Sequence, residues 1–146
     1  MATTISTKIT IKTRPERIWE ILTDLDRYSK WNPFIRSIQG ILNPGQHIKV
    51  HILPPDSKGM HFRPKITAVV PNQLLSWLGT LWLGGLFDGA HRFELTDNRD
   101  GSTTFVHSET FKGILVPFLK GQLKQTEKGF ELMNQALKER AESSET

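Results

Sequence analysis

Two histidines and one glutamate occur in neighbouring segments of the sequence at spacings that suit acid–base chemistry. His91 begins one run of alternating polar and apolar residues, and His107 and Glu109 stand two positions apart in the next run. Imidazole titrates near neutral pH, and a neighbouring carboxylate fixes which ring nitrogen carries the proton. Side chains of these types transfer protons, hold the polar end of a ligand, or bind a transition metal.

The two runs predict a pair of antiparallel strands that brings these side chains together. Residues 97–101 read Asp-Asn-Arg-Asp-Gly, which is typical of a hairpin loop. A tight loop there predicts that His91 pairs with His107. Side chains alternate between the two faces of a strand, so one face carries the following residues, and we expect it to face the interior: His91, Phe93, Leu95, Phe105, His107, Glu109 and Phe111.

Four interpretations of the two histidines and Glu109 stay open at this point. They form a proton-transfer set, the polar lining of a pocket, a metal site of two histidines and one carboxylate, or buried polar groups that satisfy one another. Ordinary sheet geometry also produces the metal-like combination, and no nucleophile stands nearby. We therefore favour pocket lining or structural pairing, and expect no catalytic residue, no bound metal and no cofactor.

The elements that position these residues follow from the periodicity of the chain. Residues 3–12 alternate as a strand does, and Thr13-Arg-Pro-Glu16 matches a capping box that predicts a short helix. A second short helix is expected to end before Pro33. Clusters of glycine, proline and asparagine then divide residues 34–111 into further strands, for a sheet of about seven strands in all.

The end of the chain has a different period. After Gly113, apolar residues recur every three or four positions as far as Leu137, which predicts one long amphipathic helix packed on the sheet. Gly121 and Gly129 weaken such a helix, so we expect them to permit close approach or to leave room. Residues 141–146 are polar and are expected to form a frayed tail.

This order of elements resembles the START-like (SRPBCC) superfamily, which includes Bet v 1-like proteins and the polyketide cyclase/dehydrase and lipid transport proteins. The resemblance covers nearly the whole chain and includes Arg14-Pro-Glu-Arg-Ile-Trp19, Leu22-Thr-Asp24 and Tyr28-Ser-Lys-Trp-Asn-Pro33. It implies an α+β helix-grip fold, in which a curved antiparallel sheet wraps the C-terminal helix around a cavity. Ligand binding is implied as a class, whereas a particular reaction is not.

The resemblance and the apolar residues together predict which side chains line the cavity. Trp77 and Trp82 have opposite parity on their strand, and we expect Trp77 to face inward. Glycines leave volume there, and the loop from Leu83 to Gly89 is a candidate lid. The predicted lining, for which core packing is the alternative at each position, is Trp31, Phe34, Trp77, His91, Phe93, Phe105, His107, Glu109, Phe111, Phe118, Leu119, Leu123, Thr126 and Phe130.

Composition limits the remaining function classes. The 146 residues fit a single domain, numbered 1–146, and contain no cysteine, which excludes disulfides and thiol catalysis. The net charge of +4 comes from scattered basic residues, so we expect no nucleic-acid binding. The apolar run from Leu74 to Phe87 is too short and too rich in glycine to span a membrane, and the N-terminus lacks the apolar core of a signal peptide, so we expect a cytoplasmic protein.

The sequence thus favours a non-enzymatic protein that binds a small hydrophobic molecule, either to transport it or to sense it. One alternative is a cyclase or dehydratase that acts on a polyketide-like substrate through acid–base catalysis. Another is a protein-interaction module that resembles Hsp90 co-chaperone domains. The sequence leaves the identity of the ligand and the oligomeric state open.

Overall fold

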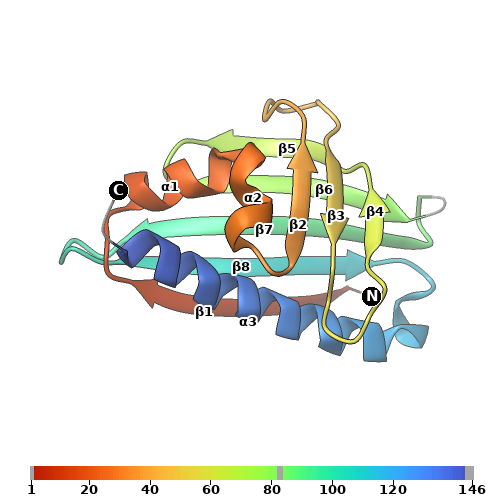
Figure 1. Cartoon of the computed structure of the whole chain (residues 1–146). Helices are drawn as coiled ribbons and strands as arrows, with labels where there is room; N and C mark the ends of the chain where they lie inside the picture. The colour runs from red at the N-terminus through yellow and green to blue at the C-terminus, as the bar shows by residue number, and fades with distance from the viewer. Residues whose placement is uncertain (1, 82–83, 144–146) are drawn as a thin grey trace.

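The computed structural model describes residues 2–81 and 84–143, and it is an α+β helix-grip fold (Figure 1). One curved, open antiparallel sheet has five strands in the order β1-β8-β7-β6-β5, and a smaller sheet has the order β2-β3-β4. An isolated bridge between His47 and Lys65 joins the two. The strands are β1 (Thr3–Ile11), β2 (Ile35–Gln39), β3 (Lys49–Ile52), β4 (Met60–Phe62), β5 (Lys65–Val70), β6 (Leu74–Leu81), β7 (Phe87–Asp97) and β8 (Thr103–Lys112).

The helices and the smaller sheet cover one face of the larger sheet (Figure 1). The helical elements are α1 (Pro15–Thr23), η1 (Leu25–Arg27), α2 (Tyr28–Trp31), η2 (Val116–Phe118) and α3 (Lys120–Glu142). The described residues therefore form eight strands where about seven were expected, because the segment from residue 46 to residue 70 makes three short strands. None of the helices in the described ranges is long and apolar enough to cross a membrane.

The first helix begins one residue later than the predicted capping box. Arg14 has an extended backbone and is the N-cap of α1, and no side chain caps the helix. Pro15 explains this boundary, because a proline disfavours the helical conformation in the residue before it. The carbonyl of Thr13 instead accepts a hydrogen bond from the Thr103 hydroxyl at 2.8 Å, which ties the start of α1 to the sheet.

The long C-terminal helix differs from the prediction at both ends. It starts at Lys120, after a separate 3₁₀ turn that contains Pro117, and it continues through Glu142. The predicted start of the frayed tail at residue 141 was wrong. Ala141 is buried in the core, and the Glu142 carboxylate accepts a 2.7 Å hydrogen bond from the Lys12 amide. Residues 144–146 of that predicted tail lie outside the described residues.

The strands β7 and β8 pair in a register two residues away from the predicted one. Their loop is closed by a hydrogen bond from the Asn98 amide to the Ser102 carbonyl, so its centre is Asp100. His91 consequently lies opposite Glu109, and not opposite His107. A shift of two residues preserves the alternation of faces, so the predicted interior face is nevertheless correct.

The core between the sheet and α3 depends on close packing at one glycine. Phe130, Met133 and Leu137 of α3 are fully buried against the sheet. Gly129 lies against the ring of Phe34, and a Cβ atom added at Gly129 would overlap that ring. The close approach that was expected of Gly129 is therefore present, and it positions Phe34 at the end of the cavity described next.

Candidate functional site

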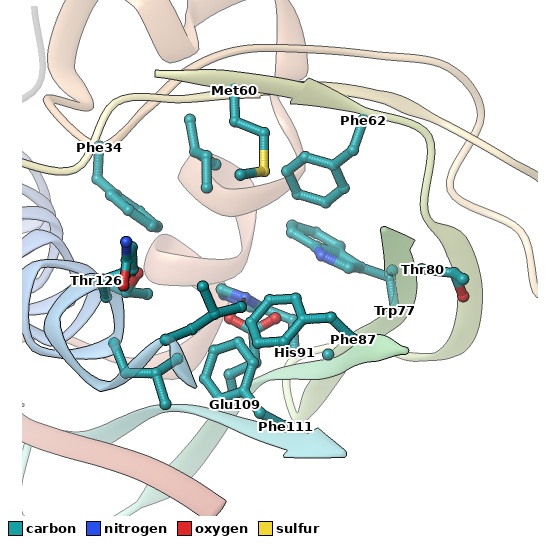
Figure 2. A pocket seen from close by; sticks show the side chains of 16 residues that line it. Phe34, Met60, Phe62, Trp77, Thr80, Phe87, His91, Glu109, Phe111 and Thr126 are labelled. Atoms are coloured by element: carbon teal, nitrogen blue, oxygen red, sulfur yellow. Dashed lines mark hydrogen bonds and ion pairs between the residues drawn. The ribbon is translucent and has the colours of Figure 1, made fainter. Parts of the chain in front are cut away.

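A cavity of about 450 Å³ lies between the larger sheet, strands β3 and β4, and α3 (Figure 2). Figure 2 shows Met60 and Phe62 on one side and Phe87, Glu109 and Phe111 on the other, with Trp77 extending between them. The volume is within the range of small-molecule sites in proteins. The lining residues are Phe34, Ile52, Met60, Phe62, Trp77, Gly79, Thr80, Phe87, Gly89, His91, Glu109, Phe111, Leu119, Gln122, Leu123 and Thr126.

The structure brings many of the predicted lining residues to this cavity. Those that line it are Phe34, Trp77, His91, Glu109, Phe111, Leu119, Leu123 and Thr126. They come from β6, β7, β8, α3 and its N-cap residue Leu119, and from the segment just before β2, so the cavity depends on elements from both ends of the chain. Trp82, the tryptophan of opposite parity, and Leu83 of the proposed lid lie outside the described residues, whereas residues 84–86 form a turn that leads into β7.

Other predicted lining residues lie elsewhere. Phe93, Phe105, His107 and Phe130 are fully buried in the core and do not line the cavity. Trp31 is half-buried and packs against Tyr28, with 5.3 Å between ring centroids. Phe118 is 80% exposed, because it belongs to the 3₁₀ turn before α3 and not to the helix.

Sequence reasoning missed the wall formed by β3 and β4. Ile52, Met60 and Phe62 line the cavity, as does Phe87 at the start of β7. Strand β4 has three residues between a proline-rich loop and Pro64, which is too short for alternation to mark its inner face. The one signal in the sequence was that Met60 and Phe62 are two positions apart and so lie on the same face of a strand.

The polar residues form a chain of contacts that runs from the cavity into the core. Nδ1 of His91 lies 3.3 Å from Oε1 of Glu109, and Nε2 of His91 lies 2.8 Å from Nε2 of His107. Nδ1 of His107 lies 3.0 Å from Oδ1 of Asn134. Asn134 was not predicted, because a single asparagine on an amphipathic helix carries no signal of its partner. His91 and Glu109 line the cavity, whereas His107 and Asn134 lie behind them.

Thr7 on β1 fixes the direction of the hydrogen bonds in this chain. Its hydroxyl donates to the His107 carbonyl at 3.0 Å, so it accepts from the Asn134 side-chain amide at 2.8 Å. The Asn134 carbonyl oxygen therefore faces His107, and Nδ1 of His107 must donate to it.

The charge of His107 then determines where the next proton lies. Burial holds the pKa of His107 well below its usual range, the nearby His91 lowers it further, and the hydrogen bond to Asn134 opposes the shift. Neutral His107 has a bare Nε2 that accepts a hydrogen bond, so Nε2 of His91 must donate to it.

The 3.3 Å contact between His91 and Glu109 is a hydrogen bond only when one of the two side chains carries a proton for it. With Nε2 of His91 protonated, a neutral His91 would present a bare Nδ1 to an ionised Glu109, and two acceptors would face each other at 3.3 Å. A proton on either partner removes this repulsion. A carboxylate and an imidazole in contact at the cavity wall are the types of group that a general acid–base site or a site for the polar end of a ligand uses.

Aromatic rings and a glycine hold the pair in place. The indole of Trp77 stacks on His91 with 4.9 Å between ring centroids, and Phe130 stacks on His107 at 3.8 Å. A Cβ atom added at Gly89 would overlap an oxygen of the Glu109 carboxylate. Glycine at position 89 therefore provides the space that Glu109 occupies.

One donor at the cavity wall has no partner. The indole N–H of Trp77 is buried, and no hydrogen-bond acceptor contacts it within residues 2–81 and 84–143. Buried donors in folded proteins are nearly always paired, so this N–H is a candidate contact for an acceptor atom of a bound molecule.

The same residue ranges contain no group of three His, Cys, Asp or Glu side chains arranged to hold a metal ion. The His91 and His107 Nε2 atoms point at each other. A second histidine pair, His51 and His61, stacks at 4.1 Å on the smaller sheet and does not line the cavity.

The fold and cavity define a START-like, Bet v 1-like domain. The chain belongs to the family described as polyketide cyclase / dehydrase and lipid transport, which matches residues 2–142. A comparison with curated protein sequences gave no match.

Solved structures with the same fold have low sequence identity to the chain. The Zhui aromatase/cyclase from Streptomyces sp. R1128 has 11% identity and a TM-score of 0.77, and the alignment covers 97% of this chain and 94% of that chain. A START superfamily protein from Mycobacterium smegmatis has 20% identity and a TM-score of 0.72, with coverage of 95% and 97%. Ara h 8.0201 has 20% identity and a TM-score of 0.69, with coverage of 99% and 100%. At these identities the likeness is one of fold.

Proposed function

We propose that the protein binds a small, largely apolar molecule in the cavity, with a polar group of that molecule at Glu109 and His91. The observation that carries the proposal is the cavity itself. Its wall is mostly aromatic and aliphatic, and its two titratable side chains, Glu109 and His91, are in contact with each other. The unpaired Trp77 N–H supplies a second polar contact. Transport or sensing of the ligand is the corresponding role, and a cytoplasmic location stays a prediction from the sequence.

Blocking the cavity tests this proposal. Thr126 is half-buried and lines the cavity, whereas Lys128 is exposed on the same helix and does not line it. We expect the neutral dye N-phenylnaphthylamine to bind the wild type saturably, and Thr126→Trp to weaken binding by at least about tenfold, since an indole would occupy the ligand volume. Lys128→Trp is the matched control and should bind as the wild type does.

Fluorescence titration measures both affinities, and thermal unfolding checks that both variants fold. Equal dye affinity in Thr126→Trp and in the wild type would show that the dye binds elsewhere and would refute the cavity as the binding site. The intrinsic emission of Trp77 should also change on binding, because this indole lines the cavity. Trp31 does not line it and should contribute little to that change.

A cyclase- or dehydratase-type activity is the second candidate, and the contact between the Glu109 carboxylate and the His91 imidazole at the cavity wall is the observation that favours it. General acid–base catalysis would let the pair take a proton from a bound polyketide-like substrate and return it elsewhere. Glu109→Gln should then lower the turnover rate by about 10²–10⁴-fold with little change in substrate affinity. If the wild type converts no polyketide-like substrate, the enzymatic candidate is refuted and ligand binding is the function that remains.

A further inference from the structure

The charge pattern of the cavity selects among the ligands that could enter it. Among the described residues that line the cavity, Glu109 is the one carboxylate, and none is a lysine or an arginine. The Glu109 side chain is only 16% exposed, so its charge is poorly screened by water. We infer that the ligand is an amine carried on an apolar body, bound as an ammonium ion that pairs with Glu109. This inference rests on the proposed function and specifies the ligand class.

A negatively charged ligand does not fit this cavity. Among the described residues that line the cavity, His91 is the one side chain that could carry a positive charge, and it already faces Glu109. The carboxylate of a fatty acid would therefore be buried beside Glu109 without a partner of its own, and burying an unpaired charge is costly. A proton on the Glu109–His91 pair offsets at most one of the two negative charges. A neutral ligand meets no such penalty, but it also gains nothing from the charge of Glu109.

The Glu109 carboxylate has capacity for a ligand donor. Its Oε1 atom faces His91, whereas Oε2 accepts no hydrogen bond from the side chains or backbone of the described ranges. Oε2 lies over Gly89, where the missing side chain leaves the carboxylate its space. A charge-assisted hydrogen bond from an ammonium group to Oε2 is shorter and stronger than one between neutral groups.

Aromatic rings surround this carboxylate and supply the second element of cation recognition. Phe87 and Phe111 stack at 5.4 Å beside Glu109, and Trp77 and Phe62 line the adjoining wall (Figure 2). The faces of such rings attract ammonium ions, most strongly where water is excluded. An amine that also bears an oxygen atom would further satisfy the unpaired N–H of Trp77.

A matched ligand series tests the inference by isothermal titration calorimetry near pH 7. Phenylbutylamine, phenylbutanol and phenylbutyrate share one apolar body and differ in the charge of one end. We expect the wild type to bind the amine at least about tenfold more tightly than the alcohol, and the carboxylate most weakly. Glu109→Gln should lower the affinity for the amine by about tenfold or more and should change that for the alcohol by less than about threefold.

Glu94→Gln is the matched control, because Glu94 lies on the neighbouring strand β7, does not line the cavity and pairs with Arg92, with 41% of its side chain exposed. It should leave the order of affinities unchanged. Alcohol or carboxylate binding as tight as amine binding in the wild type overturns the inference, and this comparison needs no variant to fold. If the wild type binds the alcohol as tightly as the amine, the proposed binding function stands, and only the preference for a cationic ligand is refuted. If neither these ligands nor the neutral dye binds, the proposed function itself fails.

Discussion

His107 is the residue whose burial ties the stability of the fold to pH. It is fully buried, and its pKa in the folded state is well below the usual value of 6.5. Above pH 6.5 the His107 ring is neutral in both the folded and the unfolded state, so its burial does not reduce the free energy of unfolding. As the pH falls below 6.5, the ring gains a proton in the unfolded state but stays neutral in the folded state. The free energy of unfolding therefore decreases by up to about 1.4 kcal/mol per pH unit until the folded pKa is reached.

Urea unfolding between about pH 7 and pH 5 measures this slope. We expect His107→Gln to lose stability less steeply than the wild type over this range, because it lacks the titrating ring. His47 is exposed, so His47→Gln is the control and should follow the wild type. An unchanged slope in His107→Gln would contradict the assignment of the pH dependence to this residue.

Gly89 is a second residue whose identity the site requires. A methyl group at this position would overlap the Glu109 carboxylate, whereas one at Gly84 would meet no atom within 4 Å. We expect Gly89→Ala to lower the free energy of unfolding by about 1–3 kcal/mol and to weaken ligand binding. Gly84→Ala should change stability by less than about 0.5 kcal/mol. Denaturant unfolding and dye titration measure the two effects, and equal stabilities of the two variants would argue against a spatial role for Gly89.

The helix α3 provides a matched pair of glycines at the scale of an element. Gly121 has open space around its Cβ position, whereas Gly129 packs against the Phe34 ring. We expect Gly121→Ala to stabilise the protein by up to about 1 kcal/mol, because alanine is the better helix former. Gly129→Ala should destabilise it by about 1–3 kcal/mol, because Phe34 and α3 would have to separate. The melting temperatures measure both changes, and a higher melting temperature for Gly129→Ala would refute the packing argument.

At the scale of the whole molecule, the sheet depends on α3 to cover its inner face. Leu123, Phe130, Met133 and Leu137 are buried on this helix, and each contributes about 1.5–3 kcal/mol if fully buried. Their sum is comparable with the total stability of an ordinary domain, which is about 5–15 kcal/mol. We therefore expect a chain that ends at Lys120 to be unfolded and not merely to lack the cavity. Circular dichroism during heating tests this, and a cooperative transition near the wild-type temperature would show that the sheet stands without α3.

The sequence by itself determined the class of fold and the inner face of β7 and β8. Strand alternation has a period of two, so an error of two residues in the register still left His91 and Glu109 on the interior face. The helical period likewise identified α3, and Leu123 and Thr126 were correctly placed at the cavity.

Only the tertiary structure decided which interior residues reach the cavity. Parity assigns a residue to a face, but it does not say where along the strand the helix crosses. Phe130 and Asn134 of α3 cover His107 and keep it in the core, whereas Glu109 lies two residues further along β8 and borders the cavity. These contacts join residues more than 20 positions apart, and such pairings arise from packing between elements and not from local periodicity.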